Sequence, residues 1–303
     1  MAGYKPQSNL PFVGVYVAEQ QGYFNDQGLN VDIKHSAVGE HVKLLLSGDV
    51  QFSTSDAGSI LKQISNSGAP LTAIALLGHR GQQGYMTLKD SKIESLKDWE
   101  DKTFGFKISL PTDYVAMIES ENVDRQKIQE VNVGFDPRIL TEGKVDILAV
   151  FKSNEPDTIR SLGYEVTVWD PYDYDVPTLG LTYITTLGYA ENNPETVSKF
   201  LKATLKGIQF AIENPNSAIE AVMMFAPESN IQHQTFMLNM EIKDAISEYT
   251  LENGIGTMLD SQWKLLYEHL LKYNALEKEF NYKDAFRMES INKIYESGNL
   301  VWP

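Results

Sequence analysis

Residues 145–169 read VDILAVFKSNEPDTIRSLGYEVTVW, and this stretch contains the pattern that decides the fold. Residues 145–151 are an apolar run of strand length, residues 155–162 follow with helical spacing, and residues 165–169 have the composition of a strand. Strand, helix and strand in succession are typical of parallel strands joined by right-handed crossovers. The stretch therefore predicts an α/β protein.

The same alternation extends outward from this stretch. Further strands are expected at 29–33, 50–54, 71–77, 103–107, 128–133 and 181–186. Beyond residue 194 only helices are expected, at 194–213, 217–225, 234–249 and 261–273. This order predicts a two-lobe clamshell with mostly parallel sheets and a helical C-terminal extension. The expected lobes are residues 1–106 with 185–303, and residues 107–184, with a ligand cleft between them.

The composition excludes several classes of function. Forty-one acidic side chains against 26 basic ones give a formal charge of −15, which argues against binding of nucleic acid or of an anionic lipid surface. The absence of cysteine excludes disulfides, thiol nucleophiles, iron–sulfur clusters and cysteine zinc sites. The five histidines form no HxxxH or HExxH pair, so no metal site is expected.

The sequence contains no signal for membrane insertion. No stretch reaches the ~18 to 20 apolar residues of a membrane span, and residues 1–6 lack the apolar core of a signal peptide. Two interpretations stay open at this point: a cytoplasmic protein, or a secreted protein whose leader is absent from this chain.

Several short segments of the chain form a recognisable set. They are PFVGVYVA at 11–18, GYF at 22–24, GLNV at 28–31, LSGDVQF at 46–52, GKVD at 143–146 and NEP at 154–156. In these segments the chain resembles substrate-binding proteins of ABC importers. The branch it resembles is the NMT1/THI5-like family, which handles thiamine pyrimidine precursors and, in some members, riboflavin.

The resemblance implies a periplasmic-binding-protein-like fold that captures a small, flat heteroaromatic nutrient and does no chemistry. It implies vitamin uptake through the permease subunits of an ABC transporter, an extracytoplasmic location (periplasmic or membrane-tethered) and no cofactor, and we expect a monomer. The family also contains enzymes that consume their own histidine and a bound vitamin B6 cofactor to make the thiamine pyrimidine. Those enzymes carry a cysteine-rich element and a cofactor lysine, whereas this chain has no cysteine and has Ser65 at the aligned position. Such an enzyme and a sensory ligand-binding domain are the alternatives.

Asn154 and Glu155 are the first candidate ligand-binding residues. A nitrogen heterocycle presents donors and acceptors along its edge. The Glu155 carboxylate can accept from an amine or ring N–H, and the Asn154 amide can donate and accept. The other interpretation is a helix N-terminus, with Asn154 as cap and Glu155 favoured by the helix dipole.

Three further polar residues follow predicted strands. Ser55 and Asp56 come after the strand at 50–54, where they either hold a polar ligand group or simply cap the next helix. Ser109 lies at the expected crossover between the lobes and is a candidate hinge or pocket residue. Residues 81–85, GQQGY, are expected to form a plain turn.

Aromatic side chains near the expected cleft could sandwich a planar ligand. The candidates are Tyr4, Phe12 and Tyr16 in the first lobe and Trp169 and Tyr172 in the second. Offset stacking contributes about 0.5–1.5 kcal/mol beyond the burial of area. Aromatic residues more often pack in a core. Trp99 and Trp263, which lie in helical patterns, are expected to do so.

Overall fold

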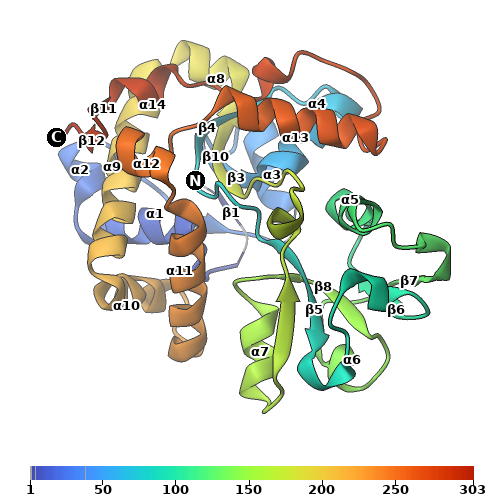
Figure 1. The fold of residues 1–303 in the computed structure, drawn as a ribbon. Coiled ribbons are helices and arrows are strands. Elements are labelled where there is room, and N and C mark those ends of the chain that lie inside the picture. The colour runs from blue at the N-terminus through green and yellow to red at the C-terminus, as the bar shows by residue number, and fades with distance from the viewer. Residues whose placement is uncertain (1, 4, 38) are drawn as a thin grey trace. The chain divides into compact units, whose positions relative to one another are not determined.

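The computed structural model describes residues 2–3, 5–37 and 39–303. The chain divides into two compact units, and each is described by itself (Figure 1). Unit 1 comprises residues 1–81 and 179–303, and unit 2 comprises residues 82–178. The predicted boundaries at 106/107 and 184/185 are therefore corrected to 81/82 and 178/179.

The first boundary moves because residues 83–88 form a strand that sequence reasoning missed. This strand, β5 (Gln83–Leu88), pairs within the sheet of unit 2. Its two glycines suggested a turn, but Gly84 lies inside the strand, where a Cβ atom would come 2.8 Å from Cγ of Lys152. The glycine is needed for close packing rather than for a turn.

Unit 2 is built on a five-stranded sheet with the strand order β7-β6-β8-β5-β9. Its other strands are β6 (Thr103–Phe106), β7 (Gln129–Asn132), β8 (Ile147–Phe151) and β9 (Val166–Trp169). Strand β6 is parallel to β7 and β8, whereas β5 is antiparallel to β8 and to β9. It follows that β6, β7, β8 and β9 all end at the same side of the sheet, which we call the carboxyl edge of unit 2.

Unit 2 also contains helices, and apolar side chains pack on its sheet. The helices are α5 (Thr112–Ser120), α6 (Arg138–Thr141) and α7 (Glu155–Ser161), with short 3-10 turns at Lys89–Ser91, Leu96–Trp99, Arg125–Lys127 and Pro171–Tyr174. Met86 of β5 packs in an aliphatic cluster, while its neighbour Tyr85 packs edge-on against Trp99 and Phe104. Side chains of alternate residues point to opposite faces of a strand, so both faces of this sheet carry a packed cluster.

Unit 1 contains a three-stranded sheet of the order β3-β10-β4. Its strands are β3 (Ser53–Asp56), β4 (Leu71–Leu76) and β10 (Leu181–Thr186), and β10 is antiparallel to both neighbours. The predicted mostly parallel sheets are thus mixed sheets. The reason is the same in both units: β5 and β10, the first strands after the chain passes from one unit to the other, run against their neighbours.

Helices make up most of the rest of unit 1. They are α1 (Leu10–Gln20), α2 (Tyr23–Asp26), α3 (Glu40–Leu46), α4 (Ala57–Ser67), α8 (Leu187–Asn192), α9 (Pro194–Glu213), α10 (Pro215–Phe225), α11 (Ile231–Ala245), α12 (Glu248–Asn253), α13 (Asp260–Lys272) and α14 (Glu289–Lys293), with a 3-10 turn at Tyr282–Ala285. Short strand pairs are β1 (Ala2–Gly3) with β2 (Lys34–His35), and β11 (Tyr295–Glu296) with β12 (Asn299–Leu300).

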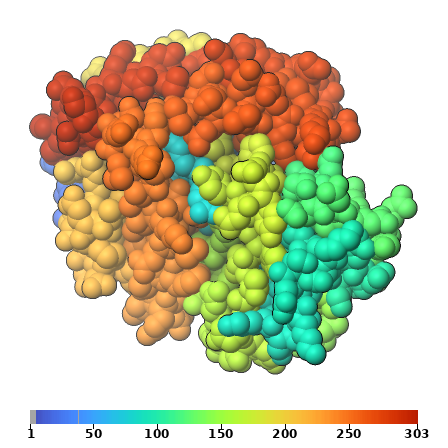
Figure 2. Space-filling view, in the orientation of Figure 1, coloured from blue at the N-terminus to red at the C-terminus, as the bar shows by residue number. Residues whose placement is uncertain are grey.

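The core of unit 1 forms where α1 packs against α9. Gly14 and Gly207 allow the close approach, because a Cβ atom on Gly207 would lie 2.2 Å from the carbonyl oxygen of Gly14. The C-terminal helices, coloured orange to red, form much of the visible surface of unit 1 (Figure 2). Trp99 in unit 2 and Trp263 in unit 1 are fully buried, which confirms that both are packing residues. Among the described residues no helix is long and apolar enough to cross a membrane.

Candidate functional site

The carboxyl edge of unit 2 brings together all five sequence-predicted site residues of that unit. Ser109 follows β6, Asn154 and Glu155 follow β8, and Trp169 ends β9 with Tyr172 just beyond it. Ligands of open α/β sheets bind outside the carboxyl ends of strands. The topology of the sheet therefore places the candidates where such a site is expected.

At the centre of this edge is a buried ion pair between Lys107 and Glu155. Lys107 follows β6, Glu155 opens α7, and their side chains are only 10% and 6% exposed. One carboxylate oxygen of Glu155 pairs with the Lys107 ammonium, and the other accepts a hydrogen bond of 2.8 Å from the Phe151 backbone N–H. A carboxylate has about four acceptor positions, so Glu155 can still accept from a ligand. The paired lysine offsets its charge.

Asn154 occupies the predicted N-terminal position of α7, but its side chain does not cap that helix. The backbone there has φ −124° and ψ −80°, and the residue is half-buried. Its backbone N–H donates to the carbonyl oxygen of Phe151 at 2.9 Å, which closes a tight turn at the end of β8. The Asn154 amide is thus held beside Glu155 without serving as a cap.

Three exposed apolar residues surround the ion pair. Ile108, Phe135 and Phe151 are 71%, 60% and 47% exposed, and they stand at the ends of β6, β7 and β8. The ammonium of Lys107 lies 5.8 Å from the centre of the Phe135 ring. Large apolar side chains exposed together on one edge indicate a binding surface more strongly than single ones do.

Ile108 also has a strained backbone. Its φ of +62° is in the left-handed region, which a β-branched residue rarely adopts. The carbonyl oxygen of Ile108 accepts a hydrogen bond of 3.0 Å from the Asn132 side chain, which helps to hold this turn. Strain of this kind concentrates at functional sites. Sequence reasoning missed Lys107, Ile108, Phe135 and Phe151. The available signal was that each lies in or next to the end of a strand and that three of them are apolar.

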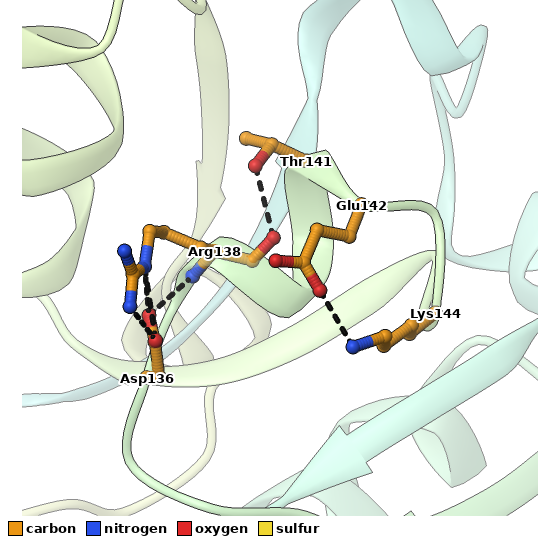
Figure 3. A network of polar contacts seen from close by, with 5 residues as sticks. All are labelled: Asp136, Arg138, Thr141, Glu142 and Lys144. Atoms are coloured by element: carbon orange, nitrogen blue, oxygen red, sulfur yellow. Dashed lines mark hydrogen bonds and ion pairs between the residues drawn. The ribbon is translucent and has the colours of Figure 1, made fainter.

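The loop that carries Phe135 is held by the polar network drawn in Figure 3. Asp136 accepts from the Arg138 backbone N–H at 3.0 Å and from its guanidinium Nε at 2.9 Å. The Thr141 hydroxyl donates to the Arg138 carbonyl oxygen at 2.9 Å, and Lys144 pairs with Glu142 at 2.6 Å. Hydrogen bonds from Arg138 lower the pKa of Asp136 to about 2, so the pair stays charged at neutral pH.

A second buried ion pair lies at the ends of β8 and β9. Lys152 and Asp170 are 2.6 Å apart and have side chains 4% and 11% exposed. Trp169, beside Asp170, is buried and its indole N–H donates to the Thr87 hydroxyl at 3.2 Å. Tyr172 is 51% exposed. Trp169 therefore supports the edge from inside, whereas the Tyr172 ring is accessible.

In unit 1 the predicted polar residues serve the end of β3. Asp56 accepts from the Ser59 backbone N–H at 2.8 Å and so caps α4, as one of the two interpretations predicts. Ser55 is buried, and its carbonyl oxygen accepts from the Thr182 hydroxyl at 2.8 Å. Both residues therefore have structural partners within unit 1.

The predicted aromatic residues of unit 1 lie in its core. Phe12 and Tyr16 of α1 are 3% and 0% exposed. The Tyr16 ring stacks on Phe225 at 4.3 Å, and its hydroxyl lies 3.0 Å from Nε2 of His35. Burial raises the pKa of Tyr16 far above its ordinary value. Tyr4, the third candidate, lies outside the described residues.

In the part of the chain that the structure describes, no three His, Asp or Glu side chains gather in a way that could hold a metal ion. The direct ligand contacts proposed from the sequence stay predictions. The geometry separates the candidates into a set at the carboxyl edge of unit 2, where Tyr172 is exposed and Glu155 and Trp169 are buried, and a set in unit 1 that the fold itself uses.

Comparison with known proteins identifies a family and several relatives of this chain. The family described as NMT1/THI5 like matches residues 9–218. The formylaminopyrimidine-binding protein of Halalkalibacterium halodurans is 25% identical over 90% of this chain and 84% of its own length. The riboflavin-binding protein RibY of Chloroflexus aurantiacus is 23% identical over 93% of this chain and 83% of its own.

Two further comparisons bear on function and fold. A 4-amino-5-hydroxymethyl-2-methylpyrimidine phosphate synthase of Saccharomyces cerevisiae is 24% identical over 72% of this chain and 68% of its own length. Among solved structures, the periplasmic aliphatic sulphonate binding protein SsuA of Escherichia coli superposes with a TM-score of 0.71 at 13% identity, over 93% of this chain and 90% of that one. The fold is that of the periplasmic binding proteins, as the sequence predicts.

Proposed function

Because this chain belongs to the NMT1/THI5-like family, we propose that it is a substrate-binding protein that captures a small, flat heteroaromatic nutrient at the carboxyl edge of unit 2. The observation that carries the proposal is the buried Lys107–Glu155 pair within a rim of exposed apolar side chains. A polar group in an apolar surround selects ligands that can pair with it and rejects those that leave it unpaired.

The residues of this edge suit an uncharged nitrogen heterocycle. Glu155 would accept from an amine or ring N–H, and the Asn154 amide beside it would donate and accept. The rings of Phe135 and Phe151 would offer faces for stacking. Because Lys107 already neutralises Glu155, binding would depend on hydrogen bonds rather than on net charge. A thiamine pyrimidine precursor and riboflavin are the two ligands we propose, which the names of two relatives support.

Delivery to the permease of an ABC importer, an extracytoplasmic location and a monomeric state belong to the same proposal. The periplasmic fold relatives support the location. Capture by closure of the two units remains a prediction from the sequence. A ligand stabilises a closed form only through its greater affinity for that form. A decrease in the radius of gyration on ligand addition, measured by X-ray scattering, would support closure, and an unchanged radius would contradict it.

The enzyme alternative receives less support from this chain. The yeast synthases are relatives, but Ser65, where the sequence resemblance would place their cofactor lysine, has an internal structural role. Its hydroxyl donates to the Lys278 carbonyl oxygen at 2.8 Å and accepts from the Lys278 backbone N–H at 2.9 Å. We therefore propose binding without chemistry. No feature described above favours the sensory-domain alternative over transport.

Two measurements test the proposal together. Native mass spectrometry of gently purified protein should reveal a bound neutral heteroaromatic compound, and titration calorimetry should then give saturable binding of a formylaminopyrimidine or of riboflavin. A cofactor-like aldimine absorbance would revive the enzyme alternative. Saturable binding that the Glu155→Gln substitution leaves unchanged would remove the carboxyl edge of unit 2 from the site.

A further inference from the structure

Unit 1 has a surface groove between α10 and α11 that the proposed ligand site does not use. The two helices pack against each other, and the cavity between them measures about 570 Å³ (Figure 1). Its lining includes Ile219, Glu220, Met223 and Met224 of α10, and Ile231 and Thr235 of α11. These residues are spaced three or four positions apart along each helix, so each set lies on one helix face.

Helix α10 is apolar on two faces, and the core of unit 1 uses one of them. Ala221 and Val222 are fully buried in that core. On the groove face, Ile219 is buried at the floor, whereas Met224 is 67% exposed, and Ile231 of α11 is 53% exposed. A surface helix normally carries charged or polar residues on its outer face. Large apolar side chains that come together on a surface mark an interaction site.

The two walls of the groove determine the form of the partner. Both walls are helices, and the backbone groups of a helix bond within that helix, so neither wall offers a strand edge for an extended peptide. The partner must therefore make contact through side chains that enter the groove. An amphipathic helix does this with apolar residues at every third or fourth position. Met223 and Met224 suit such a partner, because the unbranched methionine side chain adapts to the shape packed against it.

The charges around the groove determine the chemistry of the partner. Glu220 lines the groove, and Glu213 and Glu228 are exposed just before and just after α10. No Lys or Arg occurs in the sequence between Lys206 and Lys243. This region is therefore acidic, as is the whole chain with its formal charge of −15. Like charge disfavours a second copy of the chain in the groove, whereas a basic partner is attracted to it.

We propose that the groove between α10 and α11 binds a basic amphipathic helix of a partner protein. Apolar side chains of that helix pack against Met223, Met224 and Ile231, and its Lys or Arg side chains pair with Glu220 and Glu228. A single helix in a groove buries little surface, and interfaces below about 1,200 Å² belong to transient complexes, so we expect a Kd on the order of 10–100 μM. The inference is independent of the ligand site in unit 2, which uses other residues.

A probe peptide of about 18 residues tests the proposal on the intact protein. It has Leu at positions i, i+3, i+4 and i+7 of each two turns and Lys at the others, which gives a helix one apolar and one basic face. The control is a scrambled peptide with the same composition and charge but no apolar face. By fluorescence anisotropy we expect the amphipathic peptide to bind about tenfold tighter or more than the scrambled one. Equal affinities would overturn the proposal, because net charge alone would then explain binding.

A matched pair of substitutions locates the apolar contact. Ile231→Gln should weaken binding of the amphipathic peptide by about tenfold. Leu251→Gln, which replaces a 70% exposed leucine of α12, should leave it unchanged. Both side chains are exposed, so neither substitution should lower the midpoint of thermal unfolding appreciably. Equal effects of the two substitutions on peptide affinity would overturn the proposal. Concentration-dependent dimerisation that Ile231→Gln abolishes would also overturn it, since a second copy would then occupy the groove.

A charge exchange tests the basic character of the partner. Glu220→Lys should weaken binding of the Lys peptide and strengthen binding of the same peptide with Glu in place of Lys. Glu248→Lys, at an exposed residue of α12, makes the same change in net charge away from the groove and is the control. A preference between the two peptides that Glu220→Lys shifts no more than Glu248→Lys does would contradict the proposed pairing.

Discussion

In both the carboxyl edge of unit 2 and the α1 region of unit 1, the sequence predicts aromatic residues that contact the ligand. The structure places the aromatic residues of these two regions differently. In unit 2, Phe135 and Phe151, which sequence reasoning missed, are 60% and 47% exposed beside a buried ion pair. In unit 1, Phe12 and Tyr16 are almost fully buried. Exposed aromatic residues next to a strand end are therefore candidates for ligand contact, whereas aromatic residues on a helix buried on all sides belong to the core.

The polar candidates show the same contrast. The Asp56 carboxylate caps α4, while the side chain of Asn154, at the corresponding position of α7, does not cap its helix. A residue that follows a strand can serve either the next helix or a ligand. The structure shows the capping role for Asp56 and not for Asn154.

The contrast between the two units predicts the largest change in the free energy of unfolding for the Phe12→Ala substitution. Removal of a buried ring should lower the free energy of unfolding by about 3–5 kcal/mol, since the lost contacts leave a cavity in the core. Urea denaturation followed by circular dichroism measures this. If the variant unfolds like the parent protein but loses ligand affinity, Phe12 is a ligand-contacting residue and the contrast between the units fails.

The second prediction concerns the buried ion pair of unit 2. Lys107→Met leaves the Glu155 carboxylate buried without its cation, which should cost about 3 kcal/mol of stability. The matched control is the double variant Lys107→Met, Glu155→Gln, which should recover a large part of that loss because no charge remains buried. Equal loss in the single and double variants would show that the pair does not act as a unit.

The Glu155→Gln substitution should weaken ligand binding. Loss of a charge-assisted hydrogen bond is expected to raise the Kd by roughly 10- to 150-fold, or about 1.5–3 kcal/mol. Titration calorimetry with the ligand identified by mass spectrometry measures the change. Asp56→Asn is the control in unit 1: asparagine caps a helix as well as aspartate does, so its Kd should change by about twofold or less. A large effect of Asp56→Asn would return Asp56 to the binding site.

Acid should destabilise unit 1 through His269 of α13. Burial, together with Lys272 and Lys62, lowers the pKa of His269 to about 4. The ordinary pKa is near 6.5, so between pH 6.5 and 4 the unfolded chain binds a proton that the folded chain does not. Stability should therefore fall across this window, by on the order of 2 kcal/mol, and level off below it. Urea midpoints at several pH values, compared between the parent and His269→Gln, test this. An identical pH slope in the variant would contradict the assignment.

The smallest effect is expected for Phe135→Ala. Its ring is exposed, so stability should change by less than about 0.5 kcal/mol, while loss of stacking should weaken ligand binding by about 0.5–1.5 kcal/mol. Calorimetry and urea denaturation of the same sample separate the two quantities. Phe135→Ala is thus the counterpart of Phe12→Ala, with the expected effects on stability and binding exchanged.

Local signals in the sequence predicted much of the fold. Helix α9 begins at Pro194 and ends at Glu213 as predicted, because a proline opens it and Asn214 with Pro215 follows it. Asp56 and Gly68 bound α4 for equally local reasons. The strand predicted at 29–33 depends on a partner, and the sequence of that segment cannot indicate whether one is present.

Long-range packing explains most of what the sequence did not predict. Strand β5 was missed because Gly84 packs closely against the side chain of Lys152, 68 residues away, and this contact leaves no local signal in the sequence. The pairing of Lys107 with Glu155 joins residues that are distant in sequence and has no local signature. The Asn154–Glu155 dipeptide, by contrast, was found because both its residue types and its place after an apolar run are local.

Amide hydrogen exchange of the protein with and without its ligand tests the central claim most directly. We predict slower exchange on ligand addition at the backbone of residues 107–109, 134–136 and 151–155, which form the carboxyl edge of unit 2. Saturable binding that leaves these three segments unchanged and protects other segments instead would contradict the account.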